Sequence, residues 1–169
     1  MKMRFYSGYG ISVDKINLIG ADDDRFKRFI ESQPTVRNQL IEWEKEKLRS
    51  DDHAAATDAY ETKIDSGLCA LYMNFGNNND DIHGFDGLIG MVLSASVGFS
   101  LVTSQDCTGE CFVIIPSCLP WEINDAYTDI KSEAQAKAMF EKSLAILTDQ
   151  SIDELGWGEH CVESIVECD

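Results

Sequence analysis

The chain has 169 residues, of which 44% are hydrophobic, and this composition is typical of a globular domain and not of a disordered chain. No run of about 18 apolar residues is present, which excludes a transmembrane helix, and the N-terminus lacks the apolar segment of a secretory signal, so we expect a cytoplasmic protein. The formal net charge of −16 argues against nucleic-acid binding and favours basic partners.

Apolar patterns predict a strand followed by three helices in the first third of the chain. Gly8 and Gly10 interrupt the strand and predict either a bulge or a close approach of another backbone. Pro34 suits the first position of the second helix, with Ser32 as its candidate cap. The predicted elements are a strand over 3–13 and helices over 25–30, 34–49 and 54–63.

The segment from Gly98 to Asp125 is the most hydrophobic and β-branched part of the chain, and it predicts a β-hairpin at the centre of the core. Asp86 is the predicted N-cap of the preceding helix, which Gly98 ends. The remaining predictions are helices over 86–96 and 133–147, a closing strand over 160–168, and a segment over 68–75 that fits either a strand or a helix. We therefore expect one α+β domain over 1–169, an antiparallel sheet built around the central hairpin and flanked by helices.

The charge is unevenly placed along the chain. Residues 1–63 are nearly balanced, with 11 basic and 12 acidic residues, whereas residues 64–130 hold nine acids and no Lys or Arg. Residues 131–169 hold nine acids and three bases. Such an acidic surface attracts basic partners, so the acids of these two regions are the predicted partner-binding residues. Those chosen are Asp80, Asp81, Glu154, Glu159, Glu163 and Glu167.

Two cysteines in the predicted hairpin turn raise the question of a metal site. Cys107 and Cys111 are four residues apart, a spacing that zinc ligands use. His160 and Cys161, near the C-terminus, complete the predicted set of ligands. A zinc bound there would be structural, because nothing beside these residues indicates an activated water. Free cysteines without a metal are the alternative that the sequence leaves open.

Sequence motifs of common enzymes are missing. The chain has no Gly-x-Ser-x-Gly, no His-Glu-x-x-His and no phosphate-binding loop that ends in Lys-Ser or Lys-Thr. We therefore expect a binding protein and not an enzyme.

Two short runs carry a resemblance to known proteins. The runs Gly-Tyr-Gly-Ile-Ser-Val-Asp over 8–14 and Ile-Pro-Ser-Cys-Leu-Pro-Trp-Glu-Ile-Asn over 115–124 resemble small acidic proteins of phages and mobile elements, some of which are anti-CRISPR inhibitors of Cas9. The resemblance implies a stoichiometric inhibitor in the cytoplasm of a bacterial host. A Cas9-type nuclease holds its heteroduplex in a positively charged channel, so a DNA mimic that covers this basic surface would block the loading of target DNA. The alternative is a zinc-binding accessory or regulatory protein of a phage or mobile element, without a nuclease target.

Overall fold

The computed structural model describes residues 2–17, 23–65, 84–98, 100–116 and 133–166. Within these ranges, five α-helices accompany a four-stranded antiparallel sheet, so the predicted α+β class is confirmed. The strands are β1 (Lys2–Ser12), β2 (Val102–Gln105), β3 (Cys111–Pro116) and β4 (Gly158–Val166). The helices are α1 (Asp23–Glu31), α2 (Pro34–Leu48), α3 (His53–Asp65), α5 (Gly84–Val97) and α7 (Glu133–Leu144), and the short 3-10 helix η1 (Val13–Lys15) follows β1.

Two further predictions concern the segment 68–75 and membrane-spanning helices. The segment 68–75, for which the sequence left strand and helix open, lies outside the described residues. None of the helices in the described ranges is both long enough and apolar enough to cross a membrane.

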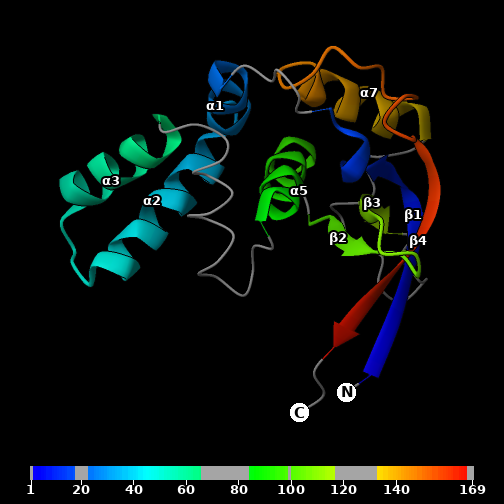
Figure 1. The fold of residues 1–169 in the computed structure, drawn as a ribbon, viewed down its shortest axis with the longest axis horizontal. Coiled ribbons are helices and arrows are strands. Elements are labelled where there is room, and N and C mark those ends of the chain that lie inside the picture. Colours follow the sequence, from blue (N-terminus) through cyan, green and yellow to red (C-terminus); the bar gives the residue numbers. More distant parts are fainter. Residues whose placement is uncertain (1, 18–22, 66–83, 99, 117–132, 167–169) are drawn as a thin grey trace.

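The two inner strands of the sheet are β1 and β3, the second strand of the predicted hairpin. The strand order is β2-β3-β1-β4, so β1 has a neighbour on each side and β2 forms an edge (Figure 1). β1 pairs with β3 over Gly8–Ser12 and with β4 over Lys2–Gly10. Beyond β3, the first part of β1 and the last part of β4 continue together as a two-stranded ribbon (Figure 1).

The close backbone approach predicted at the two glycines of β1 is confirmed. A Cβ atom added to Gly8 would lie 1.7 Å from the carbonyl oxygen of Ile115, and one added to Gly10 would lie 2.0 Å from that of Val113. Any side chain at these positions would push β3 away from β1. The glycines therefore allow the two strands to pair where the sheet bends.

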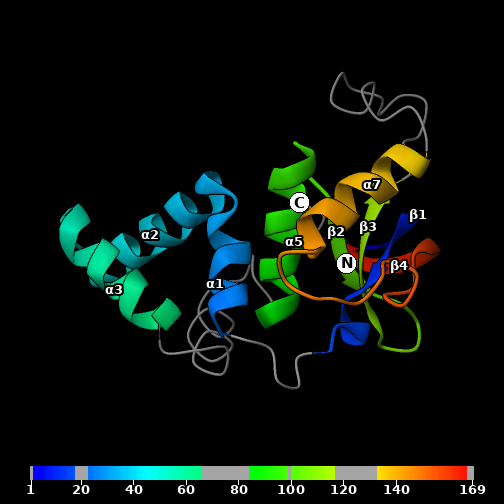
Figure 2. The ribbon, with the colours of Figure 1, turned by 90° about the horizontal axis from the view of Figure 1, so that it is seen from above.

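One hydrophobic core joins the helices to the sheet. α5 lies between the helices α1–α3 on one side and the sheet with α7 on the other, as two perpendicular views show (Figures 1 and 2). Its buried residues pack in one cluster with residues of α1, α2, α3, α7, β1 and β3. Members of this cluster include Ile11, Phe26, Phe29, Leu40, Tyr60, Leu88, Val92, Val113 and Phe140. One domain over 1–169 stays a prediction.

The opposite face of the sheet closes on itself. Phe112, Ile114 and Val162 are buried there in a second, smaller cluster, which Tyr6 and Val102 flank. The two edge strands approach each other across this face, because the Ser104 hydroxyl of β2 donates a hydrogen bond to the Glu163 carbonyl of β4. The sheet therefore rolls toward a small barrel and brings the end of β4 beside β2.

Two predicted helix caps are wrong. α2 begins at Pro34 as expected, but its N-cap residue makes no side-chain hydrogen bond, and the Ser32 hydroxyl donates instead to the carbonyl of Phe29 at the end of α1, at 2.6 Å. α5 begins at Gly84, which places Asp86 inside the first turn and not at the N-cap. A short polar residue near a helix start can occupy the N-cap, the first turn or the end of the preceding helix. The sequence alone therefore does not distinguish among these positions.

Candidate functional site: an acidic cleft

A cleft of about 1070 Å³ lies between α2, α5 and the edge strand β2. Its acids come from three elements: Asp86 lies on α5, Asp106 follows β2, and Glu163 lies on β4. The described residues that line the cleft include no Lys or Arg. Several of the others offer hydroxyl or amide groups, namely Thr35, Gln39, Ser94, Ser100, Thr103 and Gln105. This lining suits a cationic group and opposes a phosphate.

A thiol and a carboxyl form a pair within this cleft. Burial raises the pKa of Asp86, and the negative charge of Asp14 raises it further. The hydrogen bond from the Cys111 thiol lowers this pKa and so offsets part of the shift. Burial also raises the pKa of Cys111 to about 12, with the negative charge of Asp86 as the next cause. The thiol is therefore protonated at neutral pH and acts as a hydrogen-bond donor. Because the thiolate is the nucleophilic form of cysteine, the protonated Cys111 thiol is a poor nucleophile.

Asp106 organises the turn between β2 and β3 at the rim of the cleft. Its carboxylate accepts hydrogen bonds from the Thr108 hydroxyl at 2.6 Å, the Thr108 amide at 2.8 Å and the Glu110 amide at 3.1 Å. These bonds, the one from the Thr108 hydroxyl first, lower the pKa of Asp106, so the group is ionised at neutral pH. The turn thereby holds a fixed negative charge beside the cleft.

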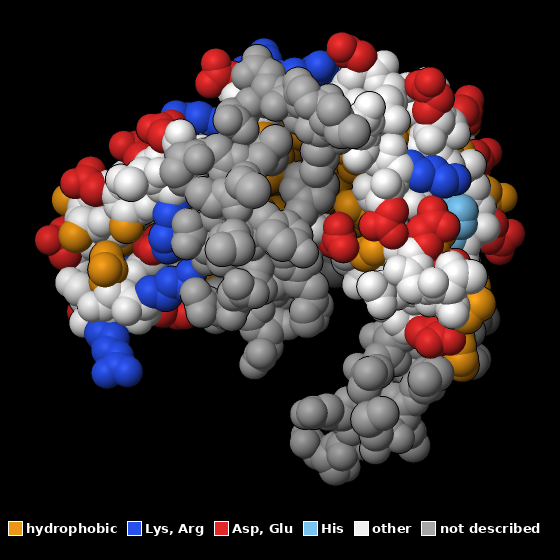
Figure 3. All heavy atoms as spheres, viewed as in Figure 1, with side chains coloured by type: hydrophobic (Ala, Val, Ile, Leu, Met, Phe, Trp, Pro, Cys, Tyr) orange, Lys and Arg blue, Asp and Glu red, His pale blue; other side chains and the backbone are white. Residues whose placement is uncertain are grey.

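The ion pairs of the described residues lie away from the cleft. They join Lys27 to Asp65, Lys45 to Glu42, Lys47 and Lys63 to Glu44, Arg37 to Glu31 and Glu61, Arg25 to Asp149, and Lys137 to Asp153. None of these pairs includes an acid of the sheet or of the cleft. On the face shown in Figure 3, Lys and Arg lie mainly over α1–α3, whereas acidic side chains predominate over the sheet and α7. The bases of these ion pairs all lie on α1, α2, α3 or α7.

The structure separates the six predicted partner-binding acids. Glu163 lines the cleft, and Glu159 is exposed on the same strand. Glu154 is exposed in the turn before β4, where its carboxylate accepts a hydrogen bond from the Ser151 amide at 2.6 Å. The other three, Asp80, Asp81 and Glu167, lie outside the described residues. The sequence prediction missed Asp86 and Asp106 as site residues, although both belong to the region without bases that could have indicated them.

The structure does not bring the four predicted zinc ligands together. Cys107 is exposed at the hairpin turn, and Cys111 is buried on the helix-covered face beside Asp86. His160 lies on the opposite face, where its ring stacks on Phe112 at 4.3 Å. The neighbouring Cys161 is exposed. No group of three or more His, Cys, Asp or Glu side chains in the described ranges is placed to hold a metal ion.

Zinc binding by this chain therefore stays a prediction, and it would require some of these side chains to move. His160 already has a structural partner, because its Nε2 lies 2.7 Å from the carbonyl oxygen of Gly156.

Comparison with known proteins adds no relative. No protein-family model, no curated protein and no solved structure matches this chain. The function must therefore be argued from the cleft and the acidic surface.

Proposed function

We propose that this chain is a protein-binding inhibitor of the anti-CRISPR type, which covers a basic surface of a Cas9-type RNA-guided nuclease and blocks the loading of target DNA. The observation that carries the proposal is the set of sheet and cleft acids that take part in none of the ion pairs of the described residues. Asp106, Glu159 and Glu163 belong to this set. The proposal gives the chain a binding role and no catalytic one.

The physical basis is competition for positive charge. A Cas9-type nuclease binds the phosphates of its heteroduplex in a channel lined by Lys and Arg. Carboxylates that reach the same side chains replace those phosphate contacts and exclude the nucleic acid. Because both interactions are ionic, inhibition should weaken as salt rises and the Debye length falls from about 8 Å at physiological ionic strength. Such a target also places the inhibitor in the cytoplasm of a bacterial host.

DNA cleavage by a guide-loaded Cas9, with this protein titrated in, tests the proposal. We expect inhibition near equimolar ratios when the protein is mixed with Cas9 before the DNA is added. At high salt we expect weaker inhibition. Normal cleavage by several Cas9 orthologues at saturating protein, together with no detectable binding at low salt, would overturn the proposal.

A pair of charge-matched variants locates the surface. The variant E154Q/E159Q/E163Q removes three predicted partner-binding charges, and E46Q/D58N/E141Q removes three exposed charges from α2, α3 and α7. The total charge changes equally in both, so a nonspecific field effect would weaken them equally. We expect a larger loss of inhibition in the first variant. Equal losses would show that the acids of β4 and its preceding turn form no specific contact.

A further inference from the structure

The paired strands β1 and β4 expose two aromatic side chains next to two acids. Phe5 is 62% exposed and Tyr9 is 41% exposed, unusually high fractions for large hydrophobic residues. The strand register sets Phe5 opposite Glu163 and Tyr9 opposite Glu159. Residues directly opposite in an antiparallel pair, and residues two apart along a strand, share one face of the sheet. We call this surface the ribbon face; its members are Phe5, Ser7, Tyr9, Glu159, Cys161 and Glu163.

The same combination of ring and carboxylate already binds an arginine inside this chain. The guanidinium carbon of Arg37 lies 5.4 Å from the centre of the Tyr60 ring. The same guanidinium lies 3.5 Å from the Glu61 carboxylate and 4.0 Å from the Glu31 carboxylate. Arg37 thus shows how an aromatic ring and carboxylates together hold a guanidinium. On the ribbon face, each aromatic ring lies opposite a carboxylate. None of the ion pairs of the described residues joins an arginine to these carboxylates.

We propose that the ribbon face binds arginine side chains of an extended segment of the partner protein, one at each pair of aromatic ring and acid. This inference rests on the proposed function, because it names the chemistry of the partner surface. Phe5 and Tyr9 are four residues apart, or about 13 Å at about 3.3 Å per residue, so two arginines four residues apart in an extended segment match them. Glu163 also lines the cleft, which makes the two surfaces continuous.

The ribbon face distinguishes arginine from lysine. A guanidinium is planar, stacks on an aromatic ring and donates two parallel hydrogen bonds to a carboxylate, whereas an ammonium is a compact and strongly hydrated charge. Trp157 stacks against the Tyr9 ring, at 6.2 Å between centroids and 20° between planes, and so holds it in position. Each aromatic ring should therefore favour arginine over lysine.

An NMR titration of the full chain with three short peptides tests the inference. The first carries two arginines four residues apart, the second has lysines in their place, and the third has its arginines three residues apart, on opposite sides of an extended chain. We expect the first to bind most tightly and to shift the amide signals of β1 and β4. Equal affinity for all three peptides, or shifts confined to other elements, would overturn the inference.

Two single substitutions and one control substitution sharpen this test. F5A removes one exposed ring, and L48A removes another large exposed hydrophobic side chain, 47% exposed, at the end of α2. We expect F5A to lose about two- to fivefold in affinity for the first peptide, and L48A to lose nothing. E163Q is the second variant and should weaken binding of both the arginine and the lysine peptides. Unchanged peptide binding by F5A and E163Q would contradict the inference. A wild-type protein that is a dimer and that F5A makes monomeric would also contradict it, because a second copy of the chain would then occupy the ribbon face.

The cleavage assay separates this inference from the proposed function. If the arginine peptide binds the ribbon face but the protein does not inhibit Cas9, the proposed function fails and the arginine site stands. A second outcome is that the wild type and F5A inhibit Cas9 equally well and the wild type binds the three peptides with equal affinity. In that case the arginine site fails and the proposed function stands.

Discussion

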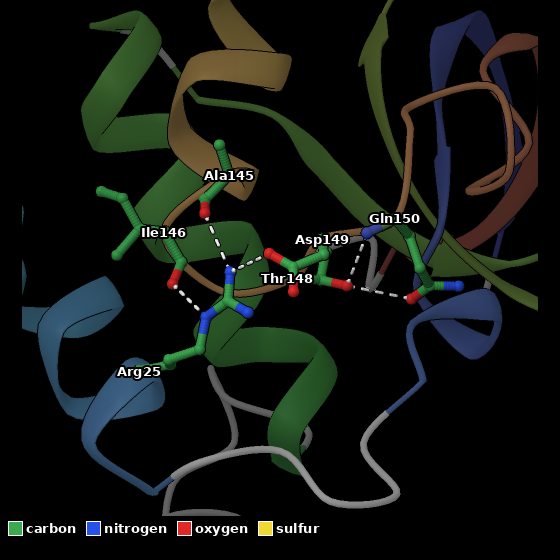
Figure 4. Close-up of polar contacts among 6 residues, drawn as sticks. All are labelled: Arg25, Ala145, Ile146, Thr148, Asp149 and Gln150. Carbon is green, nitrogen blue, oxygen red and sulfur yellow. Dashed lines mark hydrogen bonds and ion pairs between the residues drawn. The ribbon is translucent and has the colours of Figure 1, made fainter.

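The guanidinium of Arg25 lies 3.0 Å from the carboxylate of Asp149 and joins α1 to the segment that follows α7 (Figure 4). The same group donates hydrogen bonds to the carbonyl oxygens of Ala145 at 3.1 Å and Ile146 at 3.2 Å. Carbonyls at the end of a helix have no partner within the helix, so Arg25 supplies one from a distant part of the chain. Since the Asp149 side chain is 93% exposed, the two carbonyl bonds should matter more than the ion pair.

The first prediction tests that order. R25A should lower the free energy of unfolding by about 1–2 kcal/mol, because it removes the charged donor from both carbonyls. D149N should cost less than about 1 kcal/mol, because an exposed ion pair contributes little. Urea denaturation of the two variants measures both values, and an equal loss in the two would show that the ion pair and not the carbonyl bonds stabilises this junction.

Local patterns were enough to predict most elements of the fold. The interleaved apolar residues around Ile11 predicted β1, the β-branched apolar run around Val113 predicted β3, and Pro34 marked the start of α2. The place of β1 at the centre of the sheet was not predictable in this way. Its partners in β3 and β4 lie at least 100 residues away in the sequence. Gly8 and Gly10 are typical of a weak strand until the close approach of β3 is known.

The site was harder to predict than the fold. Cys107 and Cys111 have the spacing of zinc ligands, but the same spacing results from any short hairpin turn. The difference lies in burial: α5 covers Cys111 and supplies Asp86 as its partner, whereas Cys107 stays exposed. The pairing of Phe5 with Glu163 likewise depends on the register of two strands at opposite ends of the chain, which no local pattern contains.

The second prediction concerns thiol reactivity. With its pKa raised to about 12, Cys111 should react with iodoacetamide far more slowly at pH 8 than the exposed Cys107 and Cys161, because only the thiolate reacts. Mass spectrometry of timed digests measures the three rates. The same order of rates in unfolding concentrations of urea would show that local sequence, and not burial beside Asp86, slows Cys111.

The third prediction is a pH dependence of stability caused by Asp86. Because its pKa is raised in the folded chain, mainly by burial, the folded state binds the proton more tightly than the unfolded state. This stabilisation is present below the ordinary pKa of an aspartate and is lost as the pH rises through the raised value. Asn does not titrate, so the stability of D86N relative to the wild type should increase as the pH rises from about 3 through the raised pKa of Asp86.

A second variant checks the cause of this pH dependence. The Cys111 thiol opposes the shift by donating a hydrogen bond to Asp86, so C111A should raise the pKa of Asp86 further. The total loss of stability with rising pH should then be larger in C111A than in the wild type. Urea denaturation over a pH series measures both effects, and a wild type that gains stability relative to D86N as the pH rises would contradict the assignment.

The fourth prediction concerns Glu44, a carboxylate that α2 buries against α3. Its side chain is 3% exposed and pairs with Lys63 and, at 3.8 Å, with Lys47. E44A removes the carboxylate that pairs with both lysines, but both lysines are partly exposed and can turn toward water. We therefore expect the free energy of unfolding to fall by about 2–3 kcal/mol, which is at or below the low end for a broken buried ion pair. E46A, an exposed position on the same helix, is the matched control and should change stability by less than about 0.5 kcal/mol. Equal stability of the two variants in urea denaturation would mean that the packing of α2 on α3 does not depend on the Glu44 ion pairs.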